Sequence, residues 1–252
     1  WAKIAVAAVE HALPGPPVSS QGGPYPVLLF SHGLCDSRHF HSQVAEELAS
    51  HGYVVIAPDH TDCFGTDFPG GPYLVGTSST DPSAIDYPNR FKDFQFLLDE
   101  LTHLQAEDPL LAGRLDLSRV GIYGMSAGGM TAEMCRRDDR LKCVALLDAV
   151  CCLQLPASGL QKPFLEMNAP GDPCLSTGAW LFTNAVTNAT SLMIRNSIHQ
   201  TFTDAAWGAL LPDGRPMGVA INACLVWFFD TYLKGQTPPF PTNPEIYNVQ
   251  RK

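Results

Sequence analysis

One serine in this sequence stands in a pattern that suits a nucleophile. Residues 120–133 read VGIYGMSAGGMTAE, with Ser126 between Gly124 and Gly128. An apolar, β-branched segment precedes it and a helix-like segment follows, which is the context of the G-x-S-x-G nucleophile elbow. At such a bend the serine backbone is strained, and glycine on either side removes side chains that would collide. We predict that Ser126 is a catalytic nucleophile, with an ordinary tight turn as the alternative.

A serine hydroxyl is a poor nucleophile unless a base removes its proton. In the chain order Ser…Asp…His of one large hydrolase class, the base follows the serine. Of the eight histidines only His199 does so, and it lies in the polar turn NSIHQTF after the apolar run SLMIR. We predict that His199 is the general base, with a surface histidine as the alternative.

Two aspartates lie where a carboxylate would orient this histidine. Asp148 closes the apolar run VALL, and Asp172 closes the next run in the segment EMNAPGDP. Both would approach the same edge of a parallel sheet, so the residues alone leave the choice open.

The developing oxyanion of an acyl transfer needs backbone N–H donors. The segment FSHGLCDSR, residues 30–38, follows an apolar run and carries Gly33, which permits a tight turn. We predict that the N–H groups of Leu34 and Ala127 form the oxyanion hole. We interpret His32 as a structural hydrogen-bonding residue rather than a catalyst.

Short apolar runs alternate with helix-periodic stretches along the chain. The expected strands are Val27–Phe30, Val54–Ala57, Val120–Tyr123, Val144–Leu147, Phe164–Met167 and Leu192–Ile194, and the expected helices are 42–51, Arg90–His103 and Val219–Tyr232. Continuously apolar strands separated by helices indicate a mostly parallel central sheet with helices on both faces. We predict one α/β domain over residues 1–252.

Three segments are expected to lack regular structure: an N-terminal lead (1–25), a long loop rich in Gly, Pro, Ser, Thr and Asp (60–88), and a Pro-rich tail (235–252). The 60–88 loop is too long to be an idle connection, so we interpret it as a rim over the active site. Phe64, Phe68 and Tyr73 from this loop, and Leu153 after Asp148, are the predicted substrate-binding residues. Packing within the loops themselves is the alternative role.

Composition limits the classes of partner. The 16 basic and 25 acidic residues give a net charge of −9, which argues against a nucleic-acid-binding face. No apolar run approaches the length of about 20 residues that spans a bilayer. No metal-ligand set, nucleotide loop or flavin fingerprint is present, so no cofactor or metal is expected. Because the chain opens on Trp1 rather than Met, we expect it to be processed, trimmed or a fragment.

The eight cysteines give a further hint about compartment. Cys35 and Cys63 follow neighbouring expected strands, as do Cys151 or Cys152 and Cys174. Such pairs would cross-link active-site loops in an oxidising compartment, which favours a secreted or periplasmic location over the cytoplasm. Buried free thiols are the alternative.

Four segments carry a resemblance to a known family: FSHGLCDSRHFHSQVAEELASHGYVVIAPDHTD, VGIYGMSAGG, LKCVALLDAV and SIHQTFTD. In this order they resemble the platelet-activating-factor acetylhydrolase family of α/β-hydrolases, the group VII phospholipase A2 type, with the LLDA and HQTF segments more specific than the elbow. The resemblance implies an α/β-hydrolase fold, Asp148 as the acid, His199 as the base, and oxyanion donors at Leu34 and Ala127.

The sequence departs from this family at three points. Members usually begin with further strands and a WYP-like motif, which are not seen before Val27, so N-terminal strands are expected to be missing or the chain is a shorter variant. The family elbow often carries His where this chain has Met125. Asp172 occupies the acid position of the related cutinase and polyester-hydrolase group.

The residues and the resemblance together predict a serine carboxylic-ester hydrolase that acts through an acyl-enzyme. The resemblance implies short-acyl esters, as small molecules or lipids. A cutinase-like polyester hydrolase with Asp172 as the acid, and a catalytically silent hydrolase fold that acts as a binding protein, remain as alternatives.

Overall fold

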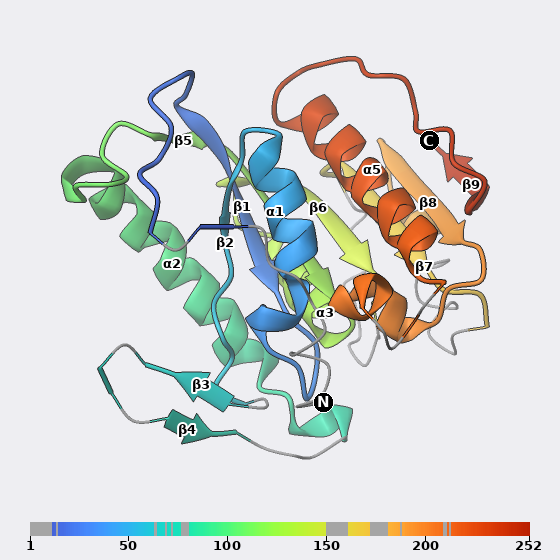
Figure 1. Ribbon diagram of the computed structural model, residues 1–252, viewed down its shortest axis with the longest axis horizontal. Helices are drawn as coiled ribbons and strands as arrows, with labels where there is room; N and C mark the ends of the chain where they lie inside the picture. Colours follow the sequence, from blue (N-terminus) through green and yellow to red (C-terminus); the bar gives the residue numbers. More distant parts are fainter. Residues whose placement is uncertain are drawn as a thin grey trace.

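The computed structural model describes residues 12–13, 15–62, 65–68, 70–71, 73–76, 81–149, 161–171, 181–186, 188–208, 211 and 213–252. In the described part of the chain, a seven-stranded sheet forms the centre of the molecule, in the order β2-β1-β5-β6-β7-β8-β9 (Figure 1). Its strands are β1 (Tyr25–Ser31), β2 (Val54–Ile56), β5 (Leu115–Met125), β6 (Leu141–Leu147), β7 (Phe164–Asn168), β8 (Ala189–Ile194) and β9 (Ile246–Arg251). All pairings are parallel except that of β9 with β8. The predicted mostly parallel α/β fold is confirmed.

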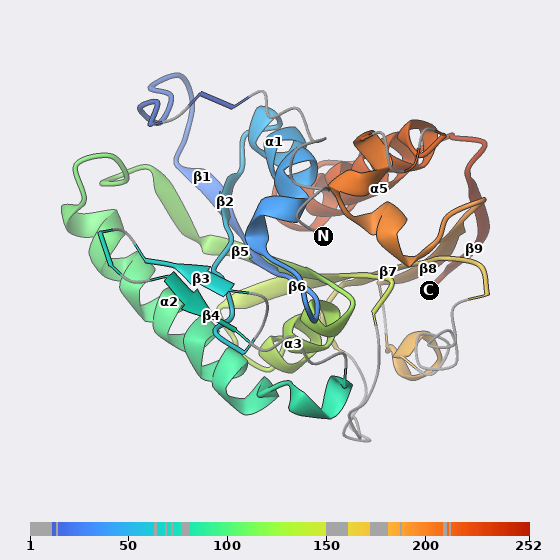
Figure 2. The ribbon, with the colours of Figure 1, turned by 60° about the horizontal axis from the view of Figure 1, so that its bottom comes forward.

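Helices cover both faces of this sheet. Figure 2 shows α1 (Ser42–Ser50) and α5 (Arg215–Tyr232) on one face, and α2 (Tyr87–Glu107) and α3 (Ala127–Cys135) on the other. Strand β1 shows why its sequence is apolar throughout: Leu28 and Phe30 pack into the core beneath α1 and α5, whereas Val27 and Leu29 pack into the core beneath α2 and α3. Each side chain is at most 1% exposed, which stabilises the fold by about 2 kcal/mol per residue.

The C-terminal segment corrects the prediction of an irregular tail over 235–252. Residues 236–245 have no helix or strand, but Ile246–Arg251 form β9, which pairs antiparallel with β8. Ile246 packs against the core, and the pairing covers the edge of β8 that would otherwise expose its N–H and C=O groups. The sequence of an edge strand of this kind is partly polar, because one side of the strand remains in water.

The stretch 60–88, predicted to be a single loop, also contains regular structure. The strands β3 (Gly65–Asp67) and β4 (Tyr73–Val75) form a small antiparallel hairpin, a short 3-10 helix covers Pro82–Ala84, and α2 begins at Tyr87. Helix α2 starts earlier than its apolar stripe because the Asp86 carboxylate accepts a hydrogen bond from the N–H of Asn89 and thereby caps the first turn. In the lead, the described residues before Tyr25 contain no helix or strand.

The parallel strands bring distant residues to one edge of the sheet. β1, β5, β6 and β8 all run in the same direction, so the segments that follow their C-terminal ends lie together. These segments carry Leu34, Ser126, Asp148 and His199, respectively. In open α/β sheets this edge is where ligands bind.

Candidate active site

Ser126 lies at the bend between β5 and α3. Its backbone has φ 56° and ψ −124°, in the left-handed half of conformational space that non-glycine residues rarely adopt. The flanking glycines are required by space: a Cβ on Gly124 would collide with the carbonyl of Gly128, and a Cβ on Gly128 would collide with the carbonyl of Ser31. The predicted strand–elbow–helix geometry is therefore present, and strain of this kind is frequent at catalytic positions.

Asp148 follows β6 and is held at three atoms, its backbone nitrogen and both carboxylate oxygens. Its N–H donates to the carbonyl of Met167 (2.7 Å), and its Oδ1 accepts the N–H of Ala169 (2.8 Å). Its Oδ2 bonds Nδ1 of His199 at 2.6 Å. Asp148 is 2% exposed, so this carboxylate is a buried acceptor with both oxygens committed. The contact fixes the proton of His199 on Nδ1 and leaves Nε2 as the nitrogen that can accept a proton.

His199 begins a short 3-10 helix, His199–Phe202, just after β8. The turn before it is set by local hydrogen bonds: Ser197 Oγ donates to the carbonyl of Ile194 (2.7 Å), and the N–H of Ile198 donates to Thr201 Oγ1 (3.0 Å). These bonds fix the backbone position from which the His199 side chain projects. The His199 side chain is 29% exposed, so the imidazole is reachable from solvent while its partner Asp148 is not.

The Ser126 bend lies beside this acid–base pair. The N–H of Ser126 donates to the carbonyl of Leu147 (2.9 Å), the residue that precedes Asp148. Within the described part of the chain the Ser126 hydroxyl makes no hydrogen bond, including none that caps α3. Hydrogen bonds between a nucleophile and its base are often long before substrate binds.

The predicted oxyanion loop packs against Ser126. A Cβ on Gly33 would lie 3.2 Å from the Cβ of Ser126, so glycine lets the loop come this close without crowding. Ala127 occupies the first position of α3, where helix N–H groups have no partner inside the helix. Among the residues that the structure describes, neither the Leu34 N–H nor the Ala127 N–H donates a hydrogen bond. Both amides are thus available for an oxyanion.

Known proteins are similar to this chain in sequence and in fold. Residues 5–66 match the family model described as platelet-activating factor acetylhydrolase, isoform II. The platelet-activating factor acetylhydrolases of Cavia porcellus and Gallus gallus are 30% and 27% identical over 50% and 73% of this chain. The solved ferulic acid esterase from Streptomyces cinnamoneus superposes with a TM-score of 0.78 at 30% identity, over 95% of this chain and 76% of that one. The chain is an α/β-hydrolase that resembles the platelet-activating factor acetylhydrolases.

The extent of the match differs between the relatives of this acetylhydrolase-like chain. The matched region spans 35% of the Cavia porcellus protein and 53% of the Gallus gallus protein.

Within the described residues, no helix combines the length and apolarity needed to cross a bilayer. The same residues contain no group of three or more His, Cys, Asp or Glu side chains arranged to hold a metal ion.

Several residues predicted for the acetylhydrolase-like site lie outside the described part of the chain. These are the alternative acid Asp172 and the predicted wall residues Phe64 and Leu153. Tyr73 starts β4, and Phe68 follows β3 with 40% of its side chain exposed. The predicted substrate wall therefore remains a prediction.

The predicted cross-links also depend on such residues, because Cys63, Cys151, Cys152 and Cys174 are not described. Three of the described cysteines, Cys135, Cys143 and Cys224, are buried free thiols. Burial raises the pKa of each of these thiols, so they remain protonated and unreactive at neutral pH.

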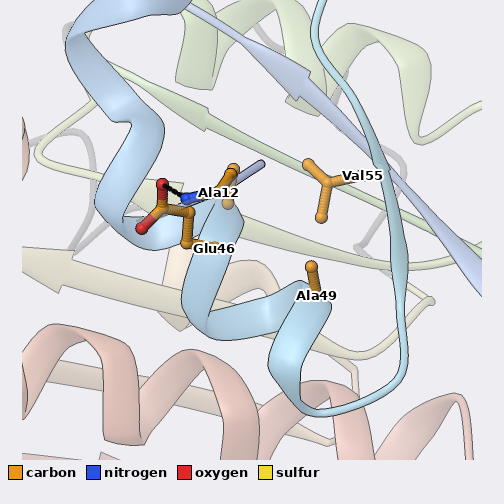
Figure 3. Close-up of a pocket in the computed structure, with 5 residues that line it drawn as sticks. Ala12, Glu46, Ala49 and Val55 are labelled. Atoms are coloured by element: carbon orange, nitrogen blue, oxygen red, sulfur yellow. Dashed lines mark hydrogen bonds between the residues drawn. The ribbon is translucent and has the colours of Figure 1, made fainter. Parts of the chain in front are cut away.

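A surface pocket of about 450 Å³ lies elsewhere on the acetylhydrolase-like fold, beside α1 and β2. Its lining residues are Ala12, Ala45, Glu46, Ala49 and Val55. Figure 3 shows Ala12, Glu46, Ala49 and Val55, with the N–H of Ala12 donating to Glu46 Oε1. None of these residues belongs to the Ser126 site, and we assign the pocket no role in ester binding.

A buried carboxyl group that the sequence pattern did not reveal lies on β7, the neighbour of β6, which Asp148 follows. Glu166 is 2% exposed and accepts a hydrogen bond from Ser191 Oγ on β8 (3.1 Å). Burial, with a smaller contribution from the charge of Asp148, raises the pKa of Glu166 to about 7 against hydrogen bonds from Asn168 and Ser191 that lower it. A single Glu in the apolar run FLEMN was the available signal, since it interrupts a buried strand.

Glu166→Gln is expected to stabilise the protein in a pH-dependent manner. The unfolded carboxyl ionises near its ordinary pKa of 4.5, whereas the folded one stays protonated up to about pH 7. Stability of the natural protein therefore falls as pH rises through this window, by about 3 kcal/mol in total. Glutamine does not titrate, so its advantage in unfolding free energy should grow between pH 5 and pH 8.

Urea denaturation at both pH values measures this difference. Glu107→Gln, at the exposed end of α2, is the matched control and should show no such growth. An equal Glu166→Gln effect at pH 5 and pH 8 would contradict the raised pKa.

Proposed function

We propose that the protein is a serine carboxylic-ester hydrolase that works through an acyl-enzyme. The observation that carries this proposal is the 2.6 Å bond between His199 Nδ1 and the buried Asp148 Oδ2, at the same sheet edge as the strained Ser126 bend. A hydroxyl, a carboxylate and an imidazole in this chain order are the parts of a catalytic triad.

The proposed reaction has two halves that use the same groups. Nε2 of His199 takes the hydroxyl proton as Ser126 Oγ attacks the ester carbonyl, and the Leu34 and Ala127 N–H groups bind the resulting oxyanion. The imidazolium then donates that proton to the leaving alcohol, which departs and leaves the acyl group on Ser126. Water, deprotonated by His199, attacks the acyl-enzyme, releases the carboxylic acid and restores the hydroxyl. Asp148 keeps the proton on Nδ1 and stabilises the imidazolium.

Short-acyl esters are the proposed substrates, because the acetylhydrolases among the relatives are named for removing an acetyl group. Esters of aromatic acids are a second candidate. The specific observation in their favour is that the ferulic acid esterase matches this chain over 95% of its length. Both candidates use the same triad and differ only in the acyl group that the site accepts.

Covalent labelling of the nucleophile tests the proposal directly. Mixing the protein with p-nitrophenyl acetate should release a rapid, stoichiometric burst of p-nitrophenolate before slower turnover. Mass spectrometry of the acid-quenched protein should then find an acetyl group on the peptide that contains Ser126. An acyl series from acetyl to octanoyl, together with methyl ferulate, ranks the two candidate substrate classes. A folded protein that shows no burst, no label and no turnover of any ester would instead be a silent hydrolase fold.

A further inference from the structure

The peptide that carries the predicted oxyanion donor is held by a histidine ring. His32 Nδ1 lies 3.0 Å from the carbonyl oxygen of Gly33. That carbonyl and the N–H of Leu34 belong to the same planar trans peptide, so they point in opposite directions. A hydrogen bond at the carbonyl end therefore fixes the direction in which the Leu34 N–H points.

The partners of His32 define its tautomer. A carbonyl only accepts, so Nδ1 carries the proton that Gly33 receives. On the other side of the ring, Nε2 accepts the backbone N–H of His60 at 3.0 Å, so Nε2 carries no proton. His32 is 1% exposed, and burial, with a smaller contribution from the charge of Arg90, lowers its pKa to about 4 against the opposing charge of Asp36. The ring thus stays neutral, with a fixed donor and a fixed acceptor.

The preceding peptide is held just as firmly. The carbonyl of His32 accepts a hydrogen bond from Arg90 Nη1 (3.0 Å), and the N–H of Gly33 donates to Asp36 Oδ2 (3.2 Å). Arg90 is 2% exposed and is itself held by Asp62, whose carboxylate accepts from Nε and Nη2 at 2.9–3.1 Å. Two successive peptides of the loop are therefore anchored, by Arg90 of α2 and by His32 and Asp36 of the loop itself. The segment after β2 holds the His32 ring and the Arg90 guanidinium in turn.

We propose that His32 is a positioning residue of the oxyanion hole, which aims the Leu34 N–H at the reacting carbonyl by holding the other end of the same peptide. This inference rests on the proposed ester hydrolysis at Ser126. A hydrogen bond at Gly33 also polarises the peptide and makes the Leu34 N–H a stronger donor. The ring does not contact substrate in this role and exchanges no proton.

Two substitutions separate this role from packing. His32→Leu introduces an apolar side chain of similar size and removes the Nδ1–H donor to the Gly33 carbonyl. The direction of the Leu34 N–H is then no longer fixed. His32→Asn keeps an N–H donor at the position of Nδ1. We expect His32→Leu to lower kcat for p-nitrophenyl acetate by about 10- to 100-fold with KM nearly unchanged, because the lost interaction is made in the transition state. His32→Asn should recover most of the lost kcat.

The affinity of a transition-state analogue distinguishes loss of the oxyanion hole from a general loosening of the fold. Loosening would not make this affinity follow kcat across the His32 variants. An alkyl boronic acid forms a tetrahedral adduct on a nucleophilic serine, so its affinity should fall in His32→Leu by the same factor as kcat and recover in His32→Asn. His103→Leu, an exposed position on α2, is the matched control and should change neither quantity. Unchanged kcat in a folded His32→Leu overturns the inference, as does equal loss in the Leu and Asn variants.

The wild-type protein provides a test that does not depend on folding of the variants. Nitrogen-15 NMR should find the His32 proton on Nδ1 across pH 6–8, and the Leu34 amide proton should move downfield when the boronic acid binds. A proton on Nε2, or an unmoved Leu34 amide in the boronate complex, overturns the inference. If the wild-type protein hydrolyses no ester and binds no boronic acid, the proposed function has failed and takes this inference with it. If it does both, and His32→Leu is as active, only the role of His32 is wrong.

Discussion

Ser126→Ala is expected to lower kcat for ester hydrolysis by a factor of about 10⁶, because no acyl-enzyme can form without the hydroxyl. What activity remains would come from the oxyanion hole and from substrate binding. The fold should survive the change. Alanine faces the same left-handed backbone as serine at this position, and within the described chain the Ser126 hydroxyl makes no hydrogen bond that would be lost. Steady-state kinetics with p-nitrophenyl acetate measures the loss, and thermal denaturation checks the fold.

Ser50→Ala provides the matched control for this experiment. Ser50 is exposed at the end of α1, where its Oγ donates to the carbonyl of Glu47 and lies within hydrogen-bond distance of Nδ1 of His51. Its activity should equal that of the natural protein. A folded Ser126→Ala variant that keeps more than about a tenth of the activity would contradict nucleophilic catalysis by this residue.

Local features of the site could be predicted from the sequence. The elbow around Ser126 depends on a steric requirement of a few adjacent residues, so two glycines and a change of hydrophobic period reveal it. The buried strands were equally visible, because parallel strands covered on both faces are apolar throughout. The strand β9 was missed, since an antiparallel edge strand is half polar and its pairing with β8 is a tertiary contact.

Contacts between distant residues could not be predicted in this way. Asp148 and Asp172 each follow an apolar run, and no local pattern shows which carboxylate meets His199, 51 residues beyond Asp148. The bond from Arg90 to the His32 carbonyl joins residues 58 apart in the chain. In the sequence Arg90 only marked the start of an amphipathic helix. Such pairs form only when the sheet and helices pack together. A local pattern in a single sequence therefore does not show which distant residues meet.

Asp148→Asn is expected to lower kcat by about 10⁴-fold while leaving the fold intact. The asparagine carbonyl can still accept the N–H of Ala169, as Asp148 Oδ1 does. Its amide then faces Nδ1 of His199 and donates to it, which moves the imidazole proton to Nε2. In that tautomer the nitrogen that faces substrate carries a proton and cannot accept one from Ser126. The variant also lacks the negative charge that stabilises the imidazolium. Kinetics on the same acetate ester, with a parallel thermal melt, measures the effect.

Asp172→Asn is the control that makes this result specific to the acid. It places the same substitution at the other aspartate that follows a strand-like run, and we expect its kcat to lie within a few-fold of the natural value. The 2.6 Å bond to His199 is the reason for expecting the larger loss at Asp148. A larger loss in Asp172→Asn than in Asp148→Asn would reverse the assignment. The carboxylate at position 172 would then orient the base, as in the cutinase-like polyester hydrolases, and Asp148 would serve only to hold the strand ends together through Met167 and Ala169.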